Sequence, residues 1–103
     1  MNDSSIIRLF FKRDESALSE TDAKYGAYCK SVAARILGSD EDAEECFNDA
    51  LYKLWQTIPP KKPDDLGAYL GMICRSRAID KRKRETREKR GGDGYDASLD
   101  ELA

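Results

Sequence analysis

Residues 66–90, LGAYLGMICRSRAIDKRKRETREKR, change character half way along. The first half repeats apolar residues at helical spacing (Leu66, Tyr69, Leu70 and Ile73), which predicts a helix packed against a core. The second half, from Arg75 onward, holds nine basic and three acidic side chains. A helix anchored at its front and basic at its rear suits the binding of a polyanion. The plainer alternative is a solvated helix end that suits the helix dipole.

The remainder of the chain does not share this basic character. Its 103 residues carry a net charge of −2, and 37% of them are charged, so the basic run is a local asymmetry. The length predicts one domain with a single modest core. The sequence contains no run of eighteen apolar residues, so we do not expect a membrane span. The apolar residues near the N-terminus lack the flanking features of a signal peptide.

The residue types argue against several kinds of chemistry. The chain has no histidine, and Cys29, Cys46 and Cys74 are far apart, so we expect neither a metal site nor a disulfide framework, and no cofactor. Each cysteine falls near the apolar face of a helical pattern, which predicts a core residue, with a redox switch as the alternative. Unpaired cysteines favour the cytoplasm. The paired carboxylates are explained by helix capping, so we do not expect an enzyme.

Three further helices are expected before residue 66. A short one begins at Ser4 or Ser5 and ends near residues 12–14, and it either docks its phenylalanines on the core or presents an aromatic patch to a partner. A longer one spans about 14–37 and ends at Gly38. A third spans about 40–57, with Ser39 as its N-cap. The chain is therefore predicted to be all-α, a compact three-helix bundle with a short additional N-terminal helix over residues 1–90, followed by a flexible acidic linker over residues 91–103.

The segment between residues 58 and 65 predicts a stiff loop. It contains three prolines together with Lys61 and Lys62, and stiffness suits a loop that keeps one shape against a ligand. Asp64 or Asp65 is expected to cap the helix that follows. Gly67 and Gly71 lie one turn apart in that helix, a spacing that lets another helix approach closely.

The predicted helix at 40–57 has the clearest apolar stripe. Its members recur at helical intervals, at Ala43, Cys46, Phe47, Ala50, Leu51, Leu54 and Ile58. The opposite side is polar and mostly acidic at its front. Two interpretations stay open: a solvated outer face, or a docking surface for a basic partner with Tyr52 as an aromatic anchor.

Two stretches together carry a family resemblance. DEDAEECFNDALYKLW (40–55) and AYLGMICRSRAIDKRKR (68–84) resemble region 2 of bacterial RNA polymerase sigma factors, most closely the extracytoplasmic-function group. The resemblance covers roughly residues 14–90. Three positions depart from the usual pattern: Ser76 replaces an asparagine, Arg77 an apolar residue, and Tyr69 a tryptophan. The polar tail resembles the linker that leads to a second helix-turn-helix domain in the family.

The resemblance implies two partners. The 40–57 helix would bind the coiled coil in the largest subunit of the polymerase core through Glu45, Asn48, Asp49 and Tyr52. The 66–90 helix and the loop before it would bind the non-template strand of the promoter minus-ten element and hold a flipped base. The DNA-binding candidates are Lys61, Lys62, Arg75, Ser76, Lys81, Arg82 and Arg84.

Asp80 is expected to be a structural ion-pair member on the core stripe, because it lies seven residues after Ile73. An anti-sigma factor is a further partner that the resemblance allows. Two other functions stay open beside transcription initiation: a helical module that binds polymerase without reading the promoter, and a generic helical nucleic-acid binder.

Overall fold

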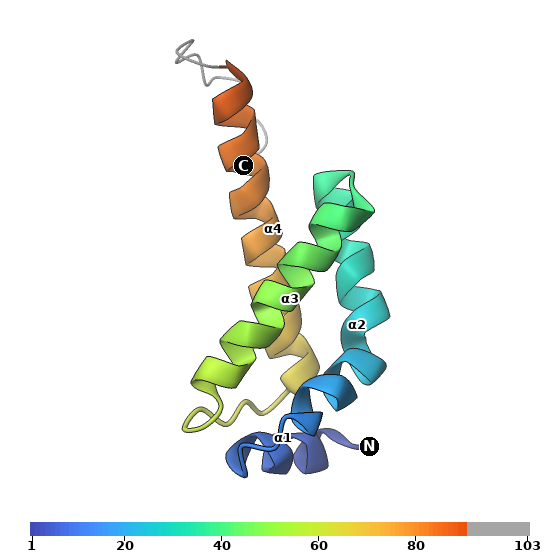
Figure 1. Ribbon diagram of the computed structural model, residues 1–103, viewed down its shortest axis with the longest axis vertical. Coiled ribbons are helices and arrows are strands. Elements are labelled where there is room, and N and C mark those ends of the chain that lie inside the picture. The colour runs from blue at the N-terminus through green and yellow to red at the C-terminus, as the bar shows by residue number, and fades with distance from the viewer. Residues whose placement is uncertain (91–103) are drawn as a thin grey trace.

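Four helices make up the domain in the computed structural model, which describes the backbone of residues 1–90 and the side chains of residues 1–87. They are α1 (Asp3–Phe11), α2 (Ser16–Leu37), α3 (Asp40–Thr57) and α4 (Leu66–Arg90). Figure 1 shows α1 lying across one end of the bundle, while the C-terminal end of α4 extends past α2 and α3. The all-α prediction is confirmed. The linker predicted for residues 91–103 lies outside the described residues.

The core lies where α2, α3 and α4 pack together and α1 closes one end. Phe47 and Leu54 of α3 are fully buried, and Leu70 of α4 and Phe10 of α1 meet them from the other helices. The predicted α3 stripe is confirmed at each position except Leu51, which is only partly buried. Burying side chains of this size is the main source of stability in such a domain.

The helix ends follow the capping residues of the sequence. Gly38 ends α2 in the left-handed region, with φ +71°, and the Ser39 hydroxyl accepts a hydrogen bond from the Asp42 amide at 3.2 Å. Of the two candidate caps for α4, Asp65 is the one that accepts from the Ala68 amide, at 3.0 Å. α2 begins at Ser16 rather than near Asp14, because the Asp14 carboxylate accepts from the amide and hydroxyl of Ser16.

Ser39→Ala should lower the free energy of unfolding by about 1 kcal/mol, because the first turn of α3 loses its side-chain cap. Urea unfolding followed by circular dichroism measures this. Ser31→Ala is the matched control, since Ser31 is exposed in the interior of α2, where alanine favours the helix. Equal stability of the Ser39→Ala variant and the parent would show that the cap contributes nothing.

Only one of the two α4 glycines serves close packing. A Cβ at Gly67 would lie 2.7 Å from Cε1 of Tyr25 in α2, which is too close. The Tyr25 ring can pack here only because Gly67 has no side chain. A Cβ at Gly71 would meet nothing within 4 Å, so the prediction that another helix approaches closely is wrong at this residue. The Tyr25 hydroxyl donates to the Asp3 carboxylate at 2.7 Å, which links α1, α2 and α4 at one point.

The three cysteines are core residues, as predicted. Cys29, Cys46 and Cys74 are buried and unbonded to one another. Burial, with smaller contributions from Cys29 and Cys46, raises the pKa of the Cys74 thiol to about 11. A thiol that stays protonated at neutral pH is a poor nucleophile, which disfavours the redox alternative. None of the described helices has the length and apolar character needed to cross a bilayer.

Candidate functional site: charged faces of α3 and α4

The outward side of α3 presents the residues expected to bind polymerase. Glu45, Asn48, Asp49 and Tyr52 are all exposed, because Phe47, Ala50 and Leu54 occupy the opposite side and are buried. We call these four exposed residues the α3 face. Tyr52 is 62% exposed. Tyrosine is enriched in protein–protein interfaces relative to the rest of the protein surface.

The later half of α4 is basic and open to solvent. Arg75, Ser76, Arg77 and Arg84 are exposed. The ion pairs found among the described side chains use Lys24, Lys30 and Lys81, and none uses an arginine. The last turns of α4 extend past the ends of its neighbours (Figure 1), whereas the stretch from Arg77 to Arg84 still lies beside α2 and α3. Such a concentration of exposed cations creates a local positive potential that attracts polyanions.

Two of the expected DNA-binding cations are engaged within the domain. The Lys81 ammonium lies 3.3 Å from a Glu45 carboxylate oxygen, and this ion pair raises the pKa of Lys81. The Arg82 guanidinium donates to the Ile36 carbonyl at 2.6 Å, in the last turn of α2, where carbonyls lack helical partners. Arg82 thus fastens α4 to the end of α2. Sequence reasoning missed this role because the two residues are far apart in the chain.

Asp80 is not the ion-pair member that we expected. It is exposed, and no cation among the described side chains pairs with it. The buried stripe of α4 runs through Leu70, Cys74 and Ala78 instead. Ile73 lies at the edge of that stripe, and a step of seven residues drifts around a straight helix, so Asp80 falls outside the packed side.

The acidic and basic faces meet at a small hollow between α3 and α4. Its volume is about 150 Å³, and its charged lining consists of Glu45 and Asp49 of α3 and Arg77, Asp80, Lys81 and Arg84 of α4. Residues expected to bind two different partners are therefore direct neighbours here, and the Glu45–Lys81 ion pair joins them.

The other DNA-binding candidates lie elsewhere. Arg75 lines a separate hollow of about 260 Å³ with Tyr28 and Met72, on the side of α4 that faces α2. Lys61 and Lys62 are exposed on the loop that precedes α4. The structure thus does not gather the candidates on one face. They lie on different sides of α4 and continue onto the loop.

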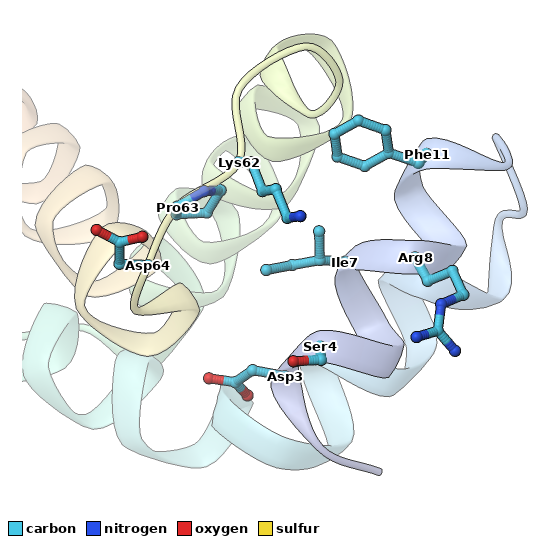
Figure 2. Close-up of a pocket in the computed structure, with 8 residues that line it drawn as sticks. All are labelled: Asp3, Ser4, Ile7, Arg8, Phe11, Lys62, Pro63 and Asp64. Carbon is cyan, nitrogen blue, oxygen red and sulfur yellow. The ribbon is translucent and has the colours of Figure 1, made fainter.

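A groove separates this loop from α1. Figure 2 shows Lys62 reaching from the loop toward Ile7 of α1, with Phe11 on one side of it and Pro63 next to it along the loop. The groove has a volume of about 500 Å³, and Arg8 also lines it. Phe10 docks in the core as expected, whereas Phe11 stays 41% exposed at the groove. Arg8 was not a candidate, and nothing in its spacing indicates a site.

The fold is all-α, and α3 presents an acidic face beside the basic helix α4. The family model described as Sigma-70 region 2 matches residues 23–88. The chain therefore belongs to the Sigma-70 region 2 family, a non-enzymatic family that binds RNA polymerase core and promoter DNA in transcription initiation. No curated protein and no solved structure gave a significant match. The matched range begins inside α2 and leaves out α1.

Proposed function

We propose that the chain is region 2 of an extracytoplasmic-function sigma factor that docks on polymerase through the α3 face and contacts the unwound minus-ten element through α4 and its preceding loop. The observation that carries this proposal is that two neighbouring helices expose faces of opposite charge. The partners would be the coiled coil of the largest polymerase subunit and the non-template strand. This function would place the domain in the cytoplasm.

The α3 face supports the first contact. Its acidic side chains suit a basic partner, and complementary charge mainly increases the rate and specificity of association. Tyr52 supplies the apolar area that charge alone does not provide. The face needs no rearrangement to be reached, because its four members are already exposed.

The basic end of α4 and the groove support the second contact. Phosphates would be held by exposed cations, chiefly Arg75, Arg77 and Arg84, since Lys81 and Arg82 have partners within the domain. Phosphate contacts position a strand but do not read its sequence. A base turned out of the strand could instead lie in the groove against Phe11 with its phosphate near Lys62, since single strands bind by stacking on aromatic rings beside cations.

A second candidate is a module that binds polymerase without reading the promoter. The engagement of Lys81 with Glu45 and of Arg82 with Ile36 favours it, because both cations are withdrawn from a bound strand. Ser76 stands where the family usually has an asparagine, and this substitution also favours a module that does not read the promoter. The two functions differ in one measurable property, the affinity of the chain for single-stranded DNA.

Two assays test the proposal together. Co-purification of the tagged chain with core polymerase tests the α3 contact, and fluorescence anisotropy with a labelled single-stranded oligonucleotide at several salt concentrations tests the α4 contact. Binding in both assays supports the proposal. Binding to polymerase alone favours the second candidate, and binding to DNA alone leaves a generic nucleic-acid binder.

Arg82→Ala and Arg84→Ala should differ although the residues are close in sequence. Arg82→Ala loses the hydrogen bond to Ile36 and should lower the free energy of unfolding by about 1 kcal/mol. Arg84→Ala should leave stability unchanged and reduce the salt slope of oligonucleotide binding by about 0.7, the value of one single-strand phosphate contact. Urea unfolding and salt titration measure the two effects. If Arg84→Ala lowered stability and Arg82→Ala reduced the salt slope, the roles assigned to the two arginines would have to be exchanged.

A further inference from the structure

Arg13 has an unusual backbone for its residue type. It lies in the turn between α1 and α2 with φ +58°, and it is the only residue other than glycine with a positive φ in the part of the chain described here. Its amide donates to the Phe10 carbonyl at 3.0 Å, and the following amide, of Asp14, donates to Leu9. Glycine is the usual residue at such a helix end, because a side chain there costs free energy. The arginine side chain therefore calls for an explanation of its own.

The Arg13 side chain binds the C-terminal end of α3. The Arg13 guanidinium donates to the carbonyl oxygens of Trp55 at 2.9 Å and Ile58 at 3.0 Å. Its Cζ also lies 3.7 Å from the centroid of the Trp55 ring. Phe10 supports the same tryptophan, with the ring centroids 6.2 Å apart. One residue thus binds the Trp55 carbonyl in the last turn of α3 and the Ile58 carbonyl just after the helix, and it also lies against the Trp55 ring.

Ile58 is where the loop that leads to α4 begins. The opening of this loop is also held by the Lys61 amide, which donates to the Thr57 carbonyl at 2.9 Å, and by the Tyr69 hydroxyl, which donates to the Thr57 hydroxyl at 3.1 Å. Arg13 is the only contact among these that comes from the α1–α2 turn. The loop then continues through Lys62 and Pro63, which form one wall of the groove opposite α1.

We propose that Arg13 is a positioning residue for the nucleic-acid site: by clamping Trp55 and Ile58 it sets the course of the loop and hence the position of Lys62 across the groove from Phe11. This inference rests on the proposed function. It adds a requirement for a residue outside the range matched by the family model, which begins at residue 23. Arg13 holds the loop and does not itself contact the strand.

The test compares Arg13→Gly and Arg13→Lys in the full chain. Glycine suits the positive φ, so the global fold should survive, which the urea midpoint checks. Lysine keeps the charge but lacks the planar guanidinium group that stacks on the Trp55 ring while donating to the two carbonyls. Arg35→Lys is the matched control, because Arg35 is exposed at the far end of α2. The probe is a fluorescein-labelled oligodeoxythymidine of twenty nucleotides.

Both Arg13 variants should bind the oligonucleotide at least fivefold more weakly than the parent, with an unchanged salt slope and unchanged binding to core polymerase. Amide hydrogen exchange at Lys61 should become at least tenfold faster in both. The fluorescence of Trp55, the only tryptophan in the chain, should change in both variants. The Arg35→Lys variant should match the parent in every measurement.

Three results would overturn the inference. Parent-like affinity in Arg13→Lys with a lower salt slope in Arg13→Gly would make Arg13 a direct phosphate contact. Parent-like affinity in both variants would show that the loop does not need the clamp. Unchanged exchange at Lys61 would show that Arg13 does not hold the loop. A parent chain with no affinity for the oligonucleotide would instead overturn the proposed DNA contact, and the exchange measurement would still decide whether Arg13 holds the loop.

Discussion

Asp49→Lys should weaken binding to core RNA polymerase at least tenfold, which corresponds to about 1.4 kcal/mol or more. Asp49 is exposed on the α3 face, so the change places a positive charge where the proposal puts a basic partner. The new lysine would also lie near Arg77 and Arg84, so DNA binding should not decrease. Biolayer interferometry with immobilised core enzyme gives the affinity, and thermal unfolding checks the fold.

Glu44→Lys is the matched control for this prediction. Glu44 belongs to the same helix and is equally acidic, but it lies on the edge of α3 that faces α2, with a carboxylate oxygen 3.7 Å from the Lys30 ammonium. Losing such a surface pair costs little stability. If Asp49→Lys and Glu44→Lys weaken polymerase binding equally, the loss reflects the change in net charge and not a contact at Asp49. If Asp49→Lys binds as the parent does, the α3 face is not the docking surface.

Replacing Arg75, Arg77 and Arg84 together by alanine should reduce single-stranded DNA affinity on the order of a hundredfold at about 0.1 M salt. All three guanidinium groups are exposed, and none is used in an ion pair with a described carboxylate. If each holds one phosphate, the salt slope should fall by about 2. The triple replacement by lysine keeps the charges and should keep the slope. An unchanged slope in the alanine variant would exclude these arginines as phosphate contacts.

Local signals in the sequence predicted the helices well. The spacing of Cys46, Phe47 and Leu54 predicted the buried side of α3, and that side in turn fixed which residues α3 exposes. Gly38 and Ser39 marked the boundary between α2 and α3, because both act through contacts within a few residues. Features that depend on neighbours in the same helix could be derived without a structure.

Contacts between distant segments could not be derived in this way. Arg82 looked like one more cation of the basic run, and only the packing of α4 beside the end of α2 brings it to Ile36. Likewise, Arg13 lies in a short turn with no pattern of its own, yet it clamps the end of α3. Asp80 was misplaced because Ile73 lies at the edge of the packed stripe, and a seven-residue step from it drifts further around the helix.

The central claim is that α3 and α4 present adjoining faces of opposite charge to two different partners. The direct test is to place a photo-crosslinking amino acid at Tyr52 or at Ser76, two exposed positions that carry no charge. Each variant is assembled with core polymerase and a pre-melted DNA bubble and then irradiated. The proposal predicts that position 52 labels the largest polymerase subunit and that position 76 labels the non-template strand. Labelling of the same partner from both positions, or of the partners in reverse, would contradict it.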